Sequence, residues 1–202
     1  MEPLRVFWKG ERRVAFKFPV IKRWSSHIAI LLRVVAKSTG TVIECGSGVG
    51  STLSLHWVCM EKGVKLITYE TNFKYFQFAN QFRSKTHRIK LVDSWASLIP
   101  QRVGVLFLDQ APGHARGLMA VQWKDMADYI VMHDTEPQEG RGDYFEKYRR
   151  KNPDFDGTDV YNYDPMWEHF PHRYTTTHTR APWTSVVSRT HDVSWLETRA
   201  WP

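Results

Sequence analysis

The chain has 202 residues, of which 42% are hydrophobic and 24% are charged, and its formal net charge is +7. This balance is typical of one folded domain with its own core and excludes a disordered chain. No apolar run approaches the roughly 18 residues of a membrane span, and the amino terminus lacks the apolar segment of a secretory signal.

The cysteine content indicates a cellular compartment, and the net charge indicates a class of binding partner. Cys45 and Cys59 are too few for a disulfide framework, so we expect a protein of the reducing cytoplasm with no membrane partner. The positive charge favours an acidic partner, such as nucleic acid or a phosphorylated or carboxylated substrate. Basic residues interleaved with aromatic ones suit single-stranded nucleic acid, but they suit any substrate cleft as well.

Short apolar runs alternate with longer amphipathic ones over most of the chain. In chain order, the pattern predicts a helix over 24–37, a strand over 41–45, a helix over 51–63, a strand over 64–70, a helix over 72–84, strands over 87–93 and 103–109, a helix over 115–126 and a strand over 128–134. Asn72 is a suitable helix N-cap, and Gly63 is a suitable helix end. This alternation is typical of a parallel α/β sheet.

The alternation ends after residue 134. Residues 135–172 are polar, aromatic and rich in turn residues, with one short helix expected over 143–151. A long irregular segment inside a compact domain is usually functional, so we expect this one to cover a substrate. The β-rich runs 173–179 and 183–189 then predict a closing hairpin.

A glycine-rich turn, Glu-Cys-Gly-Ser-Gly-Val-Gly-Ser over 44–51, joins the first predicted strand to its helix. Ligands of open parallel sheets bind beyond the carboxyl ends of the strands, where this turn lies. Gly46 would permit the tight turn, Gly48 would let a ligand approach the backbone, and Gly50 would let the helix pack near the strand. The helix amino terminus near Ser51 offers free N–H groups to a polar ligand.

Acidic residues end the next two strands. Glu70 suits hydrogen bonds from ribose hydroxyls, and Asp93 lies where an adenine amino group would be met. Each alone would be an ordinary strand-end charge, but together with the glycine turn they predict a nucleoside site. A dinucleotide fingerprint would have glycine in place of Ser51, and Glu44 would repel a pyrophosphate but attract a cation. S-adenosylmethionine (SAM), with its sulfonium and ammonium groups, fits this pattern.

The ExGxGxG pattern resembles the SAM-binding motif of class I methyltransferases. In the run ITYETN, Glu70 matches the ribose-binding acid of that family, and Asp93-Ser94-Trp95 matches its adenine-binding turn. The resemblance covers about residues 24–190. It implies a Rossmann-like three-layer sandwich whose seven-stranded, mostly parallel sheet ends in an antiparallel hairpin. The whole chain would be one methyltransferase domain, with 1–23 as an N-terminal extension.

The resemblance also implies which residues hold SAM. They are Glu44, Gly46, Ser47, Gly48, Gly50, Ser51, Glu70, Asp93, Ser94, Trp95 and Asp109. Trp95 would either cover the adenine face or serve as a core aromatic, and Cys45 is expected to be a small buried filler.

A second group of polar residues ends the fourth and fifth strands. Asp109, His133 and Asp134 should converge near the transferred methyl group, with His133 as a candidate base for a hydroxyl acceptor. Alternatively, Asp109 and Asp134 would bind Mg²⁺ and orient a diol or sugar hydroxyl. This arrangement resembles metal-dependent small-molecule O-methyltransferases, including sugar-modifying ones with an HDT-like element. The simpler alternative is that the two aspartates contact SAM or cap the segments that follow.

Further side chains would contact the acceptor or merely anchor the covering segment. They are Tyr144, Tyr148, Tyr163, Trp167 and His169. Arg116 and Arg141 would meet an anionic acceptor, although surface charge is the favoured interpretation of both.

Methylation of nucleic acid is the competing enzyme class. Methylation of a base amino group resembles a D/N-P-P-aromatic element after the fourth strand, but this chain has Asp-Gln-Ala-Pro-Gly over 109–113. Ribose 2′-O-methylation resembles a set with lysine after the fifth strand, where this chain has His133 and Asp134. The sequence therefore favours SAM-dependent O-methylation of a small-molecule or sugar hydroxyl. Methylation of RNA or DNA and a non-catalytic SAM-binding module are the alternatives, and the oligomeric state is left open.

Overall fold

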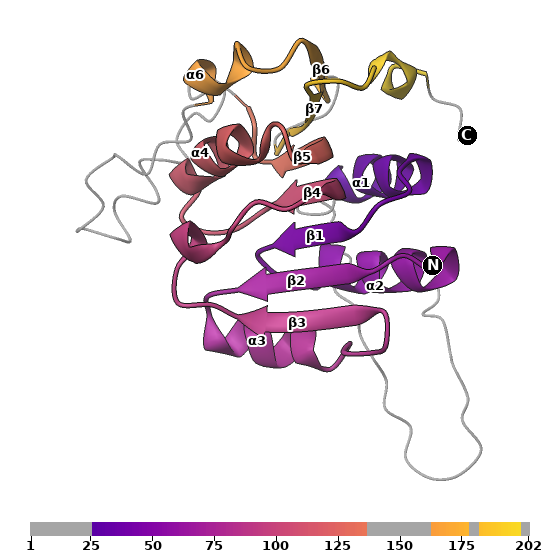
Figure 1. Cartoon of the computed structure of the whole chain (residues 1–202), viewed down its shortest axis with the longest axis vertical. Helices are drawn as coiled ribbons and strands as arrows, with labels where there is room; N and C mark the ends of the chain where they lie inside the picture. Colours follow the sequence, from indigo (N-terminus) through magenta and orange to yellow (C-terminus); the bar gives the residue numbers. More distant parts are fainter. Residues whose placement is uncertain (1–25, 137–162, 178–181, 199–202) are drawn as a thin grey trace, which may run out of the picture.

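A seven-stranded sheet forms the centre of the molecule (Figure 1). The computed structural model describes residues 26–136, 163–177 and 182–198. The strands are β1 (Val42–Cys45), β2 (Leu66–Glu70), β3 (His87–Leu91), β4 (Val103–Leu108), β5 (Ala127–His133), β6 (His172–Thr175) and β7 (Thr184–Ser188). The helices are α1 (Ser26–Lys37), α2 (Ser51–Lys62), α3 (Phe73–Asn80), α4 (His114–Trp123) and α6 (Asp164–Trp167), with 3-10 turns η1 (Trp95–Ser97) and η3 (Ser194–Leu196).

The strand order is β3-β2-β1-β4-β5-β7-β6. Neighbouring strands from β3 to β5 pair in parallel, and β7 pairs antiparallel with both β5 and β6. The predicted mostly parallel sheet with a terminal antiparallel hairpin is therefore confirmed. Because β1 and β4 are neighbours in space but not in sequence, the order of the strands reverses between them. A crevice at the carboxyl ends of such a strand pair is where ligands of open α/β sheets bind.

Helices cover the sheet on both faces, which gives the expected three layers (Figure 1). On one face, the apolar sides of α1 and α2 pack against Val105 and Phe107 of β4. On the other face, α4 and α6 pack against Leu106 and Leu108 of the same strand. Successive side chains of a strand point to opposite faces, so one strand supplies both cores.

Helix ends follow the expected local signals. At the start of α3, the side chain of Asn72 accepts hydrogen bonds from the N–H groups of Lys74 and Tyr75, so the predicted N-cap is confirmed. At the end of α2, Gly63 has a φ of 67° and donates its N–H to the carbonyl of Met60. Glycine adopts this left-handed conformation without steric cost, which explains why α2 stops there.

Two helices end earlier than their sequence patterns predict, and α4 stops at Trp123 rather than at residue 126. α3 ends at Asn80 rather than at residue 84. The N–H groups of Gln81 and Phe82 bond to carbonyl oxygens three residues back, and this tighter winding ends the α-helix.

Some expectations lie outside the described residues. These are the extension over 1–23, the short helix over 143–151 and most of the covering segment over 135–172. Both cysteines are buried and free, as expected for Cys45. Among the helices of the described ranges, none combines the length and the apolar character that crossing a bilayer requires.

Candidate functional site

The three glycines of the turn between β1 and α2 have different surroundings. Gly46 has a φ of 86°, and a Cβ there would lie 2.7 Å from the Cα of Gln110, so only glycine fits. A Cβ on Gly48 would meet only the hydroxyl of Ser51, at 3.4 Å, so the space beside this backbone is open. A Cβ on Gly50 would meet Ile28 of α1 at 3.5 Å. Gly50 thus lies beside α1, and its expected role in letting α2 pack near the strand stays a prediction.

Glu44 lies beneath this turn and is fully buried. Its carboxylate accepts hydrogen bonds from the hydroxyls of Thr52, at 3.0 and 3.1 Å, and Thr68, at 2.7 Å. Burial raises the pKa of Glu44 to about 7, although these hydroxyls oppose the shift. In this structure the carboxylate supports the first turn of α2, and its direct contact with a cationic ligand stays a prediction.

Glu70 ties the glycine turn to the end of β2. Its carboxylate accepts hydrogen bonds from the N–H and hydroxyl of Ser47, at 2.7 and 2.9 Å. Its other oxygen accepts from the N–H groups of Thr71 and Asn72, at 2.8 and 2.9 Å. This side chain is buried, and it lies at the carboxyl edge of the sheet beside the turn.

The turn after β3 contributes one exposed and two structural residues. Asp93 is exposed, and the hydroxyl of Ser94 accepts the N–H of Ala96 to begin η1. Trp95 is buried and donates its indole N–H to the carbonyl of Ala111, at 2.8 Å. Trp95 thereby joins this turn to the loop after β4.

Asp109, His133 and Asp134 lie together at the ends of β4 and β5. Nδ1 of His133 is 3.2 Å from Oδ1 of Asp109 and 3.8 Å from Oδ1 of Asp134. Burial alone would raise the pKa of Asp109, but Arg116 and His133 lower it below its ordinary value. Burial alone would lower the pKa of His133, but Asp109 raises it. Both directions favour the charged forms, as in an ion pair between the two side chains.

Arg116 is a structural centre of this group, and our expectation of a surface charge was wrong. It is 4% exposed. Its guanidinium lies 3.2 Å from the carboxylate of Asp109 and 2.8 Å from that of Asp134. It also donates to the carbonyls of Gln110 and His133, each at 2.8 Å. Nothing in the local sequence distinguishes this arginine from an exposed one on α4.

His27 of α1 is a second residue of the site that the sequence interpretation missed. Its ring centre lies 4.2 Å from that of His133 and 5.3 Å from that of Phe107. It is buried, and burial together with the nearby His133 lowers its pKa to about 4. Its spacing from Ile30, Leu31 and Val34 places it on the apolar side of α1, and this periodicity was the available signal.

The described part of the covering segment is anchored beside this group. Tyr163 is buried, and its hydroxyl lies 3.4 Å from the carbonyl of His133. The ring of Trp167 lies 6.0 Å from that of Tyr163, and His169 is partly exposed beside Glu168. The other candidates, Tyr144, Tyr148 and Arg141, lie outside the described residues.

Backbone contacts join the glycine turn to the second group. The N–H of Asp109 donates to the carbonyl of Cys45, at 2.9 Å, and the Cβ direction of Gly46 is closed by Gln110. The two candidate halves of the site are therefore adjacent, at the switch point between β1 and β4.

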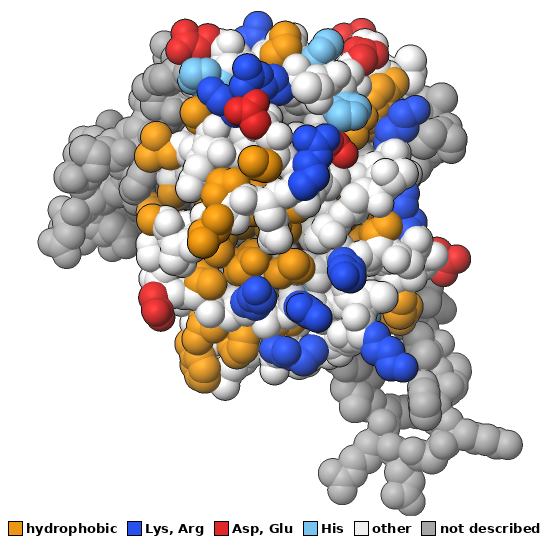
Figure 2. Space-filling view, in the orientation of Figure 1, with side chains coloured by type: hydrophobic (Ala, Val, Ile, Leu, Met, Phe, Trp, Pro, Cys, Tyr) orange, Lys and Arg blue, Asp and Glu red, His pale blue; other side chains and the backbone are white. Residues whose placement is uncertain are grey.

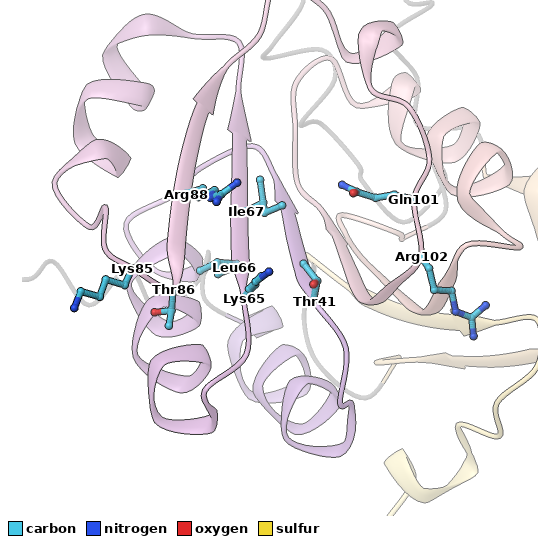
Figure 3. Close-up of a pocket in the computed structure, with 9 residues that line it drawn as sticks. All are labelled: Thr41, Lys65, Leu66, Ile67, Lys85, Thr86, Arg88, Gln101 and Arg102. Carbon is cyan, nitrogen blue, oxygen red and sulfur yellow. The ribbon is translucent and has the colours of Figure 1, made fainter.

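A cavity of about 240 Å³ lies at the opposite edge of the sheet, near the amino ends of the strands (Figure 3). Its cationic lining residues are Lys65, Lys85, Arg88 and Arg102. Figure 3 shows Lys85 and Arg102 pointing outward from its two sides. In the view of Figure 2, several lysine and arginine side chains lie on the lower half of the molecule. The cationic residues that line the cavity lie near the amino ends of the strands, away from the glycine turn and Asp109.

Comparisons with known proteins agree with this fold. No protein-family model matches the sequence, and no curated protein matches it. Solved structures that are similar to this chain include the following three. A Staphylococcus aureus protein assigned as a caffeoyl-CoA O-methyltransferase is 11% identical, with 80% of this chain and 82% of that chain covered and a TM-score of 0.57.

The other two similar structures are at the same level of identity. A Bacillus cereus O-methyltransferase in complex with S-adenosylhomocysteine (SAH) is 11% identical, covers 80% of this chain and 78% of its own, and has a TM-score of 0.52. The METTL16 methyltransferase domain is 11% identical, with coverages of 86% and 84% and a TM-score of 0.52. The chain therefore has the fold of class I SAM-dependent methyltransferases.

The contrast between two glycines gives a first prediction. Gly46→Ala should lower the free energy of unfolding by about 2–4 kcal/mol, because the new methyl group meets backbone and φ is positive. Gly48→Ala is the matched control and should change it by less than about 1 kcal/mol. Urea unfolding measures both values, and equal losses for the two variants would contradict the geometry of the turn.

The buried carboxyl of Glu44 gives a second prediction. The folded chain keeps this proton up to about pH 7, whereas the unfolded chain releases it near 4.5, so the group lowers stability as the pH rises between these values. Glu44→Gln cannot titrate. Its stability relative to the parent chain should therefore increase from pH 5 to pH 8, by on the order of 3 kcal/mol.

Urea unfolding at the two pH values checks this difference, and the exposed-site control is Glu61→Gln on α2. The free energies of unfolding of Glu44→Gln and of the parent chain are compared at each pH. If their difference is the same at pH 5 and pH 8, Glu44 is ionised throughout this range.

Proposed function

We propose that this protein is a SAM-dependent methyltransferase that acts on a hydroxyl group of a small molecule or sugar. The observation that carries the proposal is the contact between the two halves of the site. The turn that would hold the cofactor packs against the backbone of Asp109 and Gln110, beside the Asp109–His133 pair. A cofactor and a proton acceptor would thus be positioned by the same strand ends, as methyl transfer requires.

The glycine turn has features that fit a nucleoside cofactor. The space beside Gly48 is open, and the backbone N–H groups of Val49, Gly50 and Ser51 have no acceptor within the described part of the chain. These donors stand at the amino terminus of α2, where polar ligand groups are favoured. SAM would supply an electrophilic methyl group when it is bound there. Glu70 would bind the ribose, with Asp93, Ser94 and Trp95 near the adenine.

The exposure of Asp109 and His133 suggests which of them would accept the proton of an acceptor hydroxyl. The Asp109 side chain is 23% exposed, whereas that of His133 is 5% exposed. Asp109 is therefore the group that an acceptor hydroxyl would reach first, with His133 behind it as the partner that orients the carboxylate. A hydroxyl becomes strongly acidic as its oxygen bonds to a carbon, so a carboxylate of lowered pKa can still accept its proton at that stage. Arg116 would hold Asp109 in place.

Binding of Mg²⁺ by Asp109 and Asp134 is kept as the metal-assisted form of this proposal. Oxygen ligands suit that ion. However, both carboxylates contact the guanidinium of Arg116, so an ion between them would have to compete with an existing cation.

Methylation of nucleic acid is less well supported by the arrangement of charge. The cationic cavity lies at the amino ends of the strands, and Asp109 lies at their carboxyl ends. A five-residue strand spans about 17 Å, so one polyanion would have to extend over that length to contact both. Methyl-transfer activity would distinguish the proposed enzyme from a module that binds SAM without catalysis.

Glu70 tests the cofactor half of the proposal. Glu70→Gln should weaken SAH binding by at least ~10-fold, because a charged acceptor for ribose hydroxyls is lost. Isothermal titration calorimetry measures the affinity, thermal unfolding reports whether the variant is folded, and Glu61→Gln is the matched control on the surface of α2. Absence of SAH binding to the parent chain at millimolar concentration would refute the cofactor assignment.

Asp109 tests the transfer half. With methyl-labelled SAM, we expect label in hydroxyl acceptors such as catechols or monosaccharides. Asp109→Asn should reduce this rate about 10²–10⁴-fold. Asp128→Asn, at the opposite end of β5, is the control. Label found only in RNA or DNA would favour the nucleic-acid alternative, and full activity of Asp109→Asn would refute the role of this carboxylate.

A further inference from the structure

Two imidazoles and one carboxylate form a compact cluster where α1 crosses the ends of β4 and β5. Within the described ranges, His27, Asp109 and His133 each offer one ligand atom, and these three atoms lie within 4.8 Å of one another. Asp109 and His133 come from adjacent strands, and His27 comes from the helix that packs across them. Three separate elements therefore bring these side chains together.

The imidazoles of this cluster have unmet hydrogen-bonding capacity. Both ring nitrogens of His27 and Nε2 of His133 are buried without a partner in the described part of the chain. Buried polar atoms are normally hydrogen-bonded, and leaving them unpaired is costly. The two unpaired nitrogens of the His27 ring are therefore unusual unless something binds beside them.

From these contacts we propose that His27, Asp109 and His133 bind one divalent first-row transition-metal ion, such as Zn²⁺. Imidazole suits Zn²⁺ and its neighbours in that row, whereas Mg²⁺ and Ca²⁺ prefer oxygen ligands. The inference does not rest on the methyltransferase proposal, because the cluster and the binding of an ion can be measured without cofactor or acceptor.

The distances suit this ligand set. Zinc binds nitrogen and carboxylate oxygen at about 2.0–2.2 Å, so two ligand atoms of one ion lie about 3–3.5 Å apart. Nδ1 of His133 and Oδ1 of Asp109 are already 3.2 Å apart, a separation that fits two ligands as well as a hydrogen bond. All separations within the cluster are at most 4.8 Å, so the longest has to shorten by roughly 1.3 Å to reach about 3.5 Å.

The charges around the cluster favour a cation. Asp109 and Asp134 carry two negative charges, and Arg116 supplies one positive charge to both. Once His133 has released its proton, as binding of an ion by this imidazole requires, one negative charge is left for an ion at Asp109. In the described part of the chain, no hydrogen bond reaches Oδ2 of this carboxylate, and this oxygen is free to act as a ligand.

Exposure indicates where the ion would meet a small molecule. His27 and His133 are buried, and the partly exposed carboxylate of Asp109 closes the cluster toward solvent. Three protein ligands leave a coordination position for water or a hydroxyl, and this position would lie on the solvent side.

Binding of Co²⁺ and Zn²⁺ to the metal-stripped full chain tests the inference. We expect one Co²⁺ per chain with the visible absorption of a nitrogen-ligated ion, and displacement of Co²⁺ by Zn²⁺ but not by equimolar Mg²⁺. His27→Phe should reduce the affinity at least ~10-fold. Phenylalanine can keep the ring contact with Phe107, so this variant should remain folded by circular dichroism. Asp109→Asn should also weaken binding.

Two matched variants make the test specific. Asp128→Asn, at the opposite end of β5, should leave Co²⁺ affinity within about threefold, since Asp128 lies outside the cluster, and His191→Gln is the control for loss of a histidine elsewhere. No Co²⁺ binding at millimolar concentration would overturn the proposal. So would binding that His27→Phe leaves unchanged, or binding that depends on Asp128 rather than on His27.

Discussion

The buried guanidinium of Arg116 fixes the geometry at the carboxyl ends of β4 and β5. It binds the carboxylates of Asp109 and Asp134 and the carbonyls of Gln110 and His133. Without this cation, two neighbouring carboxylates would repel each other in a poorly solvated place. The position of Asp109 beside His133, and with it every chemical role considered for this pair, depends on that one side chain.

The loop after β4, which Arg116 holds through the carbonyl of Gln110, also restricts the conformation of the glycine turn. Gln110 closes the Cβ direction of Gly46, and the N–H of Asp109 bonds to the carbonyl of Cys45. Glu70 and Glu44 fix the same turn from two other sides, through Ser47 and Thr52. The turn is thus held in place by groups from β1, β2 and the loop after β4, with open space beside Gly48.

Much of this arrangement could be predicted from the sequence, because hydrophobic periodicity and strand-end residues are local signals. The sheet, the caps at Asn72 and Gly63 and the meeting of Asp109 with His133 all followed from such signals. The burial of Arg116 could not be predicted, because it depends on carbonyl groups 6 and 17 residues away. His27 was overlooked because its neighbours, Phe107 and His133, lie on strands of the sheet. These contacts are known only once the packing of α1 on the sheet is known.

The position of Glu44 shows another limit of reasoning from charge. An acid beside a glycine turn suggests attraction of a cation, but strand alternation turns this side chain beneath the turn. There it meets the hydroxyls of Thr52 and Thr68. Thr52 lies on α2, and Thr68 lies on the neighbouring strand β2. The strand that carries Glu44 was predicted from the sequence, whereas the direction of its side chain depends on the neighbouring elements.

The most direct test of the central claim, that the carboxyl ends of β1, β2 and β4 form a SAM site, is a crystal structure of the chain with SAH. We expect the ribose hydroxyls on Glu70, the methionine part over Gly46 and Gly48, and the sulfur facing Asp109. SAH bound elsewhere, or bound with its sulfur directed away from Asp109 and His133, would contradict the assignment of this edge of the sheet as a methyl-transfer site.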